Sequence, residues 1–206
     1  MFSFNVSTSN LEFLVGFIST AIIGFVFLRM SFSYTRKRAG RPYAQGRVRA
    51  PSISFFSVIS KLLFVSSMLL TLISVWLTAD WLLIIYNEPV ARIAGVVLVL
   101  VGYLRLGRTF THLGEHYSPS FDAYVPLALI TKGCYRYIRH PIYLYNLWIS
   151  FGLAVASGSI LVAANALIGL LFILKIISME EACLTKYFPG YSLYSKKTWR
   201  LIPFVY

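Results

Sequence analysis

Residues 142–179 read IYLYNLWISFGLAVASGSILVAANALIGLLFILKIISM, two apolar runs on either side of the triplet Ser157-Gly158-Ser159. A helix needs about 20 mostly apolar residues to cross a bilayer; the run 160–179 meets this length, and the run 142–156 is short for it. Three residues leave room only for a tight turn between the two runs. The stretch therefore predicts a helical hairpin within a membrane.

The whole chain is apolar to a similar degree. Of its 206 residues, 58% are hydrophobic and 13% are charged, and the mean hydropathy is +0.72. Soluble domains carry roughly 25% charged residues, and a soluble domain of this size could not cover itself with so little polar surface. The composition predicts an integral membrane protein with no room for a second large domain.

Three further apolar runs precede the hairpin, at about 11–30, 53–77 and 91–106. Each has the composition of a membrane-spanning helix. Together with the hairpin they predict an all-α fold with five transmembrane helices, the last two forming a C-terminal helical hairpin.

Positive charge gathers in the polar segments between these runs. The net charge is +12, and the basic residues fall after the first run, before the hairpin and in the tail: Arg36, Lys37, Arg38, Arg41, Arg47, Arg49, then Arg108, Lys132, Arg136, Arg139, then Lys186, Lys196, Lys197, Arg200. Five spans put all three segments on one side, which an excess of Lys and Arg assigns to the cytosol. We expect the N-terminus outside and the C-terminus inside. The charge then indicates membrane orientation rather than nucleic-acid binding.

The stretch Arg139-His140-Pro141-Ile142-Tyr143 stands where the hairpin begins. Pro141 suits the first turn of a helix, where its missing N–H costs nothing. The N-terminus of a helix attracts anions, and Arg139 and His140 sit on that end. The stretch therefore indicates a site for a carboxylate or phosphate, where a soluble cofactor could meet a lipid substrate. The alternative is that Arg139 only anchors the helix among lipid headgroups.

Two adjacent acids, Glu180 and Glu181, follow the last apolar run. At most one of them can point at a given site, and acids near a membrane core are costly and often functional. One carboxylate could take an amino group or a ribose diol of a cofactor; the alternative is that both are solvated at a helix end near Met179. Lys175, about one turn before that end, either extends to the headgroups or serves as a cation for a substrate headgroup.

The remaining polar residues are less specific. His112 and His116 have the spacing of two helical metal ligands, but Gly114 lies between them and no HExxH pattern exists, so we expect no metal. Cys134 and Cys183 match no zinc or CxxC spacing and are expected to be free thiols. Eight tyrosines near this interface fit either the aromatic belt of a membrane protein or a stacking wall for an adenine: Tyr117, Tyr124, Tyr135, Tyr137, Tyr143, Tyr145, Tyr191 and Tyr194.

Four ordered blocks resemble the isoprenylcysteine carboxyl methyltransferase family, which belongs with the membrane phospholipid methyltransferases. The blocks are Thr131-Lys132-Gly133-Cys134-Tyr135, Arg139-His140-Pro141-Ile142-Tyr143, Glu180-Glu181, and a tail with Phe188-Pro189-Gly190-Tyr191 and Leu201-Ile202-Pro203-Phe204. The resemblance covers about residues 105–206. It implies a methyltransferase core at 105–206 that contains the cofactor-binding segment, the hairpin and the tail, preceded by three spans at 1–104 with little specific signal.

The resemblance implies S-adenosylmethionine as the methyl donor, bound in a pocket on the cytosolic side. Its cofactor contacts fall on Leu127, Ala128, Leu129, Ile130, Gly133, Tyr135, His140, Pro141, Ile142, Tyr143 and Glu180. Arg139 and Glu181 become the candidate catalytic residues, and Lys175, Tyr145, Tyr191 and Tyr194 become candidate substrate-binding residues. Direct displacement at the sulfonium methyl needs alignment and desolvation more than acid–base groups. A carboxylate acceptor needs no proton removed, whereas an amine acceptor would need a base.

Two departures from the family pattern concern the acceptor. Members that methylate prenylcysteine tend to carry Arg four residues before the first Glu, where this chain has Ile176; Lys175 lies one position away, about 100° round a helix. Tyr145 stands where the family favours Gly, and a bulky residue there would reshape the channel next to the cofactor. The prenylcysteine carboxylate is the family default, and a phospholipid amine or another lipid is the alternative.

Two other classes stay open. The hairpin and the tyrosine-rich tail also resemble NADPH-dependent membrane sterol reductases, although those proteins have about twice as many spans, and a non-catalytic membrane scaffold is the third reading. Lipid or prenylated substrates from the bilayer are the expected partners. The expected location is a bacterial inner membrane or the endoplasmic reticulum, with the site facing the cytosol.

Overall fold

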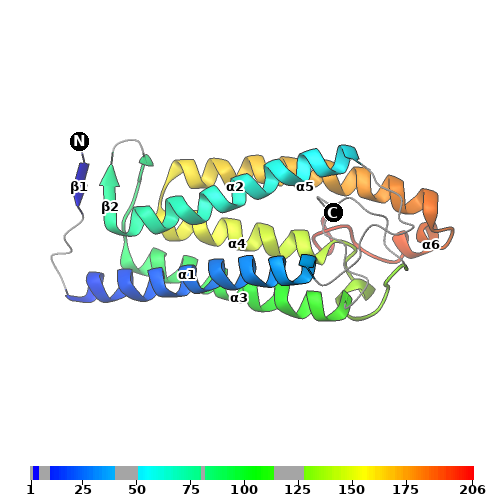
Figure 1. The fold of residues 1–206 in the computed structure, drawn as a ribbon, viewed down its shortest axis with the longest axis horizontal. Coiled ribbons are helices and arrows are strands. Elements are labelled where there is room, and N and C mark those ends of the chain that lie inside the picture. Colours follow the sequence, from blue (N-terminus) through cyan, green and yellow to red (C-terminus); the bar gives the residue numbers. More distant parts are fainter. Residues whose placement is uncertain (1, 5–9, 40–50, 80–81, 114–127) are drawn as a thin grey trace. The chain divides into compact units, whose positions relative to one another are not determined.

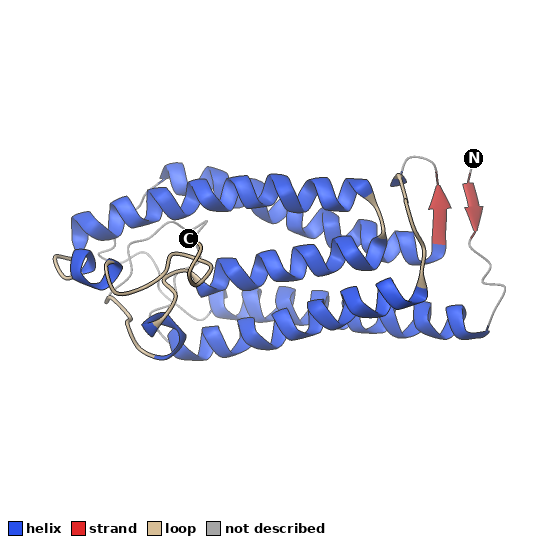
Figure 2. Ribbon diagram, turned by 180° about the vertical axis from the view of Figure 1, so that it is seen from behind, coloured by secondary structure: helices blue, strands red, loops and turns tan. Residues whose placement is uncertain are grey.

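The computed structural model describes residues 2–4, 10–39, 51–79, 82–113 and 128–206, and side chains within 13–32, 55–76, 82–113 and 128–206. Five long helices account for most of this part of the chain (Figures 1 and 2): α1 (Asn10–Ala39), α2 (Pro51–Trp76), α3 (Pro89–Leu113), α4 (Pro141–Ser157) and α5 (Ile160–Tyr187). Two short elements follow α3 and α5, the 3₁₀ turn η3 (Gly133–Arg136) and α6 (Tyr191–Ser195). Strands β1 (Phe2–Phe4) and β2 (Leu77–Ala79) pair antiparallel, with Phe2 opposite Ala79.

The predicted all-α membrane fold is confirmed. Four helical segments are long and apolar enough to cross a bilayer: Phe13–Phe32, Phe55–Trp76, Pro89–Leu113 and Ile160–Tyr187. Helix α4, at the position of the fourth predicted span, is apolar but only 17 residues long. A helix therefore stands at each of the five predicted positions, and four of the five have the length of a span.

Proline marks where three of these helices begin. Pro51, Pro89 and Pro141 are the first residues of α2, α3 and α4. A proline fits this position because its fixed φ is helical and its missing N–H would have no partner there. The far end of α5 is set in a similar way, because the helix stops at Tyr187, just before Phe188 and Pro189, and the residue before a proline disfavours the helical conformation.

The end of α5 corrects one expectation from the sequence. The apolar run suggested a helix end near Met179, but α5 continues for two more turns to Tyr187. No glycine or proline stands between Met179 and Pro189 to stop it. Glu180 and Glu181 therefore lie within the helix rather than at its C-terminus, and the unfavourable dipole at a helix end does not act on them.

The chain forms two compact units, each built from separate segments. Unit 1 comprises Met1–Arg41, Leu62–Tyr103 and Leu147–Gly169. In it, α3 and α4 approach so closely that a Cβ on Gly95 would lie 2.3 Å from the Ala156 nitrogen, and one on Gly152 would lie 2.9 Å from the Gly95 oxygen. Polar groups also join its helices: Trp76 Nε1 donates to Thr20 Oγ1 at 2.8 Å.

The predicted hairpin turn between α4 and α5 belongs to unit 1 and is confirmed. Only Gly158 and Ser159 separate the two helices. Gly158 has φ +63°, and a Cβ there would lie 2.1 Å from the Tyr86 oxygen. Backbone bonds pin the turn from both sides, since Ile85 N donates to the Gly158 oxygen at 2.9 Å and Ile160 N donates to the Leu83 oxygen at 3.1 Å. Glycine is therefore required at position 158 for both its conformation and its lack of a side chain.

Unit 2 comprises Pro42–Lys61, Leu104–Asn146 and Leu170–Tyr206. It holds the end of α3, η3, the start of α4, the second half of α5 and the C-terminal tail. Nearly every residue that the sequence singled out for chemistry falls in this unit. The two units divide the chain by packing, so the functional division at residues 104 and 105 stays a prediction.

Candidate functional site

The C-terminal tail lies beside the residues that lead into α4. Arg139 N donates to the Trp199 oxygen at 2.8 Å, and His140 N donates to the Arg200 oxygen at 3.1 Å. Trp199 N in turn donates to the Tyr137 oxygen at 2.9 Å, and Ile138 and Trp199 form a parallel bridge. The Arg139-His140 stretch is thus fixed by main-chain bonds to a segment some sixty positions away along the chain.

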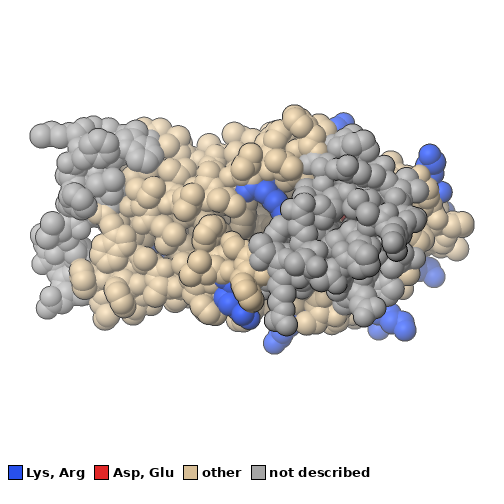
Figure 3. All heavy atoms as spheres, viewed as in Figure 1, with Lys and Arg blue, Asp and Glu red and all other residues tan. Residues whose placement is uncertain are grey.

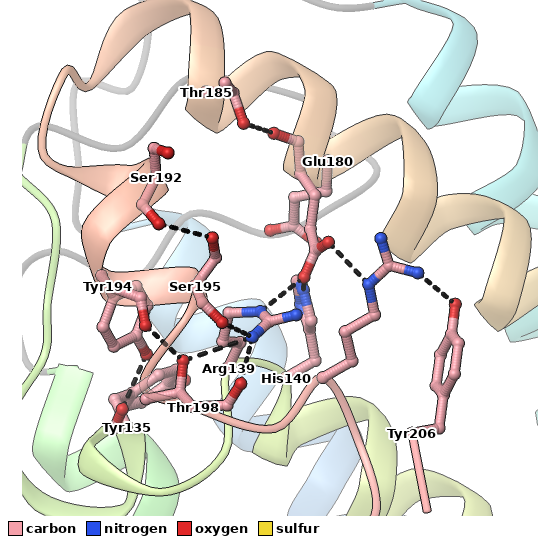
Figure 4. A network of polar contacts seen from close by, with 12 residues as sticks. Tyr135, Arg139, His140, Glu180, Thr185, Ser192, Tyr194, Ser195, Thr198 and Tyr206 are labelled. Carbon is pink, nitrogen blue, oxygen red and sulfur yellow. Dashed lines mark hydrogen bonds and ion pairs between the residues drawn. The ribbon is translucent and has the colours of Figure 1, made fainter.

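The Glu181 carboxylate is the centre of the polar network in unit 2. Figure 4 draws this network and labels Arg139, His140 and Glu180 among its residues. Glu181 Oε1 accepts from Arg139 Nε at 2.7 Å and lies 3.2 Å from His140 Nε2, while Glu181 Oε2 accepts from Arg200 Nε at 2.8 Å. The side chains of Arg139, His140 and Glu181 are 8%, 4% and 10% exposed, and that of Arg200 is 40% exposed. A buried carboxylate needs such partners, because its desolvation would otherwise be prohibitive.

Arg139 uses its remaining donors on the tail. Its Nη1 donates to the Ser195 oxygen at 2.7 Å, to the Thr198 backbone oxygen, and to Thr198 Oγ1 at 3.3 Å. Together with the bond from Nε to Glu181, these contacts tie α5 to the tail through one guanidinium. Because the side chain is nearly buried, Arg139 does not reach out to lipid headgroups, which was the alternative role for it.

Glu180 presents the accessible carboxylate of the pair. Tyr143 Oη donates to Glu180 Oε2 at 3.0 Å, and His140 Nδ1 lies 3.7 Å from the same oxygen. The His140 and Tyr143 rings stack with centroids 5.8 Å apart. The Glu180 side chain is 32% exposed, against 10% for Glu181. Successive residues on a helix point about 100° apart, so one glutamate is enclosed by the network while the other remains at its accessible edge.

Glycine at position 133 has a structural explanation. Gly133 has φ +64°, and a Cβ there would lie 2.7 Å from the His112 ring. A side chain is therefore excluded by conformation and by space. The cofactor contact that the sequence predicts for Gly133 stays a prediction; the lack of space beside the His112 ring at the end of α3 is by itself a reason for glycine here.

Three tyrosines join η3 to the tail. Tyr135 is buried, and its backbone oxygen accepts from Tyr194 Oη at 2.7 Å. The Tyr191 and Tyr194 rings are 5.9 Å apart, and Tyr191 is only 2% exposed. Burial raises the pKa of both hydroxyls, that of Tyr194 to about 12, and the charge of Glu181 raises the pKa of Tyr191 further. Tyr191 and Tyr194 are predicted to touch substrate; the structure buries Tyr191 and leaves Tyr194 half-buried.

Other predicted site residues lie outside the Glu180–Glu181 network. Lys175 is exposed on α5, while its neighbour Ile176 is buried at 1% exposure. Tyr145 is half-buried and within electrostatic range of Arg105 on α3. Since residues two apart on a helix point in nearly opposite directions, Tyr145 lies on a different face of α4 from Tyr143.

The predicted cofactor segment is only partly described. Ala128, Leu129 and Ile130 are half-buried, and Leu127 lies outside the described residues. Pro141 is buried and Ile142 half-buried in the first turn of α4. Among the residues that the structure describes, no group of three or more His, Cys, Asp or Glu side chains could hold a metal ion.

Sequence reasoning missed three members of the network: Arg200, Thr198 and Ser195. Arg200 was counted only as a charge of the tail that sets orientation. Nothing in the sequence around Arg200 distinguishes it from the other basic residues of the tail, since its partner Glu181 lies 19 positions away. Ser195 and Thr198 contribute backbone oxygens, which no side-chain pattern could reveal.

Comparison with known protein families gives a match. Residues 89–191 match the protein family described as Phospholipid methyltransferase. The matched segment runs from the first residue of α3 to Tyr191 in α6, and it contains Arg139, His140, Glu180 and Glu181. No curated protein matches the chain.

Proposed function

Because the chain belongs to the phospholipid methyltransferase family, whose members are membrane methyltransferases that act on lipids, we propose that it transfers the methyl group of S-adenosylmethionine to a lipid or lipidated acceptor. The reaction site is the accessible edge of the network around Glu181. The observation that carries this proposal is the pairing of Glu180 with Tyr143 at 3.0 Å beside the buried Glu181 cluster.

The residues at this edge fit the proposed cofactor. S-adenosylmethionine carries an ammonium group, a ribose diol and a sulfonium charge, and an accessible carboxylate can bind any of them. Glu180 supplies that carboxylate, oriented by Tyr143. The Tyr191 hydroxyl is buried close to Glu181, whose charge raises the pKa of that hydroxyl, so it belongs to the network and not to its accessible edge.

Methyl transfer from a sulfonium requires the protein mainly to position the donor and the acceptor. When bound, S-adenosylmethionine supplies an activated methyl group on a sulfonium centre. The chain's own residues then have to orient the donor and the acceptor and keep water out. The Arg139–Glu181–Arg200 ion pairs suit a positioning role, because all three side chains are committed to one another and to the tail.

The nature of the acceptor is the finer part of the proposal. A prenylcysteine carboxylate, the family default, calls for a cation near the first glutamate, but Ile176 occupies that position on α5 and is buried. The two arginines of the network are both paired with Glu181. This arrangement favours an acceptor without negative charge at the reacting atom, such as a phospholipid amine. For an amine, Glu180 or His140 is the candidate base.

We place this site on the cytosolic side of a bacterial inner membrane or of the endoplasmic reticulum. The support is the bias of basic residues toward the segments of unit 2. Among described residues of these segments, Lys132, Arg136, Lys196 and Lys197 are exposed.

Binding of labelled S-adenosylmethionine to the full chain in lipid nanodiscs tests the proposal, with labelled NADPH as the competing ligand. We expect S-adenosylmethionine to bind, Glu180→Gln to weaken it, and Glu88→Gln, which changes an exposed acid in unit 1, to leave it unchanged. Binding of NADPH without binding of S-adenosylmethionine would contradict the proposal and indicate a reductase. Binding of neither ligand would support a scaffold. Incubation of lipid extracts with the labelled cofactor then identifies the acceptor.

A further inference from the structure

An exposed apolar surface is formed by the C-terminal tail and the residue after η3. Phe204 is 87% exposed, Val205 76% and Tyr137 62%. Trp199 and Ile202 are also exposed, and the Trp199 and Phe204 rings lie 5.3 Å apart. We call these five residues the platform.

The platform is ordered rather than a loose end. The backbone N–H of Trp199 donates to the backbone oxygen of Tyr137. Leu201, which lies in the chain between the exposed residues of the tail, is 2% exposed. Beyond it the chain turns back, with Val205 N and Tyr206 N both donating to the Ile202 oxygen at 3.1 and 3.0 Å. Phe204 takes φ +66° in this turn, a conformation that costs a non-glycine residue free energy. The surrounding contacts hold its ring in an exposed position.

Basic side chains lie next to one part of the platform, near Tyr137 and Trp199. Arg136 lies over the Tyr137 ring at 5.7 Å, and Lys196 and Lys197 are exposed just before Trp199. The two acids described in unit 2, Glu180 and Glu181, are engaged in the network rather than at the platform. The charged side chains visible on the face in Figure 3 are almost all Lys or Arg. Exposed Trp, Tyr and Phe together with Lys and Arg are the composition of a membrane–water interface, and the positive charge fits anionic headgroups.

The length of α5 allows the platform to lie at the depth of the headgroups. From Ile160 to Glu180 the helix rises by about 30 Å, at 1.5 Å per residue, which is the thickness of the hydrocarbon core. Glu181 is bonded to Arg139, and Arg139 N is bonded to the Trp199 oxygen. With Ile160 at one edge of the hydrocarbon, Trp199 is linked to α5 close to the residue at which that helix reaches the other edge.

We infer that the platform seats in the headgroup layer of the membrane that the helices cross, and that its partner is a lipid surface with anionic headgroups. Exposing this apolar surface to water is unfavourable, whereas the headgroup region and the upper acyl chains can cover it. Because Arg139 and His140 are bonded to the backbone of residues 199 and 200, seating the tail in the lipid also fixes the segment that carries the candidate site. The inference concerns the tail and stands whether or not the protein is a methyltransferase.

Tryptophan fluorescence in nanodiscs tests the inference. The variant keeps Trp199 as its only tryptophan by changing Trp76, Trp81 and Trp148 to Phe, and the nanodiscs contain phosphatidylcholine with part of the lipid as phosphatidylglycerol. We expect blue-shifted emission, strong quenching by lipids brominated near the carbonyl end of the acyl chain, weaker quenching by lipids brominated near the methyl end, and little quenching by acrylamide. Lys196→Gln with Lys197→Gln should reduce the lipid quenching most in anionic nanodiscs.

A matched control keeps Trp148, on α4, as the only tryptophan. We expect its emission to be quenched best by the deeper bromines. If the triple variant fails to fold, Phe204→Cys in a chain with Cys134→Ser and Cys183→Ser, labelled with an environment-sensitive fluorophore, gives the same readout. Strong acrylamide quenching without quenching by any brominated lipid would overturn the inference. Emission that changes with the number of copies per nanodisc would also overturn it, because the platform would then cover a second chain.

Discussion

Arg200 donates through Nε to Glu181 Oε2 at 2.8 Å, the carboxylate oxygen that Arg139 and His140 leave open. Arg200 is itself held by the tail, since its Nη1 donates to Tyr206 Oη at 3.0 Å and its guanidinium lies 5.2 Å from the Tyr206 ring centre. The buried carboxylate is therefore shared between a cation at the start of α4 and a cation in the tail. Removing either leaves the nearly buried carboxylate with one cationic partner fewer.

Arg200→Met should destabilise the protein. Loss of one partner of a buried carboxylate is costly, but Arg200 is 40% exposed, so solvent screening reduces the expected cost to about 1–2 kcal/mol. Thermal unfolding in detergent measures it. Arg200→Lys should recover part of the loss, and Lys197→Met, which removes an exposed charge nearby, should change little. Equal effects of Arg200→Met and Lys197→Met would show that the ion pair contributes nothing.

Arg139→Lys should loosen the tail more than it weakens the helices. A lysine keeps the charge but lacks the planar group that bonds Glu181, Ser195 and Thr198 at once. Hydrogen exchange followed by mass spectrometry should show faster exchange of the amides of residues 197–201, with little change in α3. Unchanged protection of the tail would mean that its main-chain bonds suffice without the guanidinium.

The positions of the helices could be predicted from the sequence because apolar runs and prolines determine them locally. Pro89, Pro141 and Pro189 lie at or just beyond helix ends, and Gly158 makes the turn that the triplet Ser157-Gly158-Ser159 suggested. The length of α5 was underestimated because the hydropathy falls at Glu180, whereas the helix continues until a residue stops it. Hydropathy indicates which residues can lie in lipid, but it does not indicate where the backbone hydrogen bonds of a helix end.

The candidate site could be predicted only in part. The motif residues Arg139, His140, Tyr143, Glu180 and Glu181 do come together. The sequence could not show that Glu181 is enclosed by the network while Glu180 stays accessible, because this depends on which glutamate faces the tail. The tail's contribution depends on backbone oxygens and on pairing across some sixty positions, and neither leaves a side-chain pattern. From the sequence, Arg200 therefore counts only among the basic residues that indicate membrane orientation, although it completes the network.

Gly133→Ala should cost about 2–4 kcal/mol, from a left-handed φ and an added Cβ that meets the His112 ring at 2.7 Å. The two causes can be separated with a double-mutant cycle. His112→Ala should relieve the steric part and leave the conformational part, so the double variant should be more stable than the sum of the single changes predicts. Strict additivity in thermal unfolding would show that η3 moves away from His112 at no cost.

Gly95→Ala should prevent α3 and α4 from packing as they do in unit 1. Its Cβ would meet backbone atoms of α4 at 2.3 and 2.6 Å, and backbone cannot yield as a flexible side chain can. We expect loss of monodisperse protein on size exclusion in detergent. Gly169→Ala is the matched control on α5, with nothing within 4 Å of its new Cβ; removing a helical glycine there should stabilise by about 0.5–1 kcal/mol. A well-folded Gly95→Ala protein would contradict the close approach.

Tyr143→Phe should weaken S-adenosylmethionine binding about three- to tenfold, the effect of losing one hydrogen bond to a charged group. The Tyr143 hydroxyl orients Glu180 at 3.0 Å, and the phenylalanine ring keeps its stacking on His140. Tyr145→Phe makes the same chemical change on another face of α4 and should leave cofactor affinity nearly unchanged. Isothermal titration in nanodiscs compares the two variants, with thermal unfolding as a check on folding. If Tyr145→Phe had the larger effect on affinity, the cofactor would have to lie on the α3 side of α4, and Glu180 would lose its proposed role.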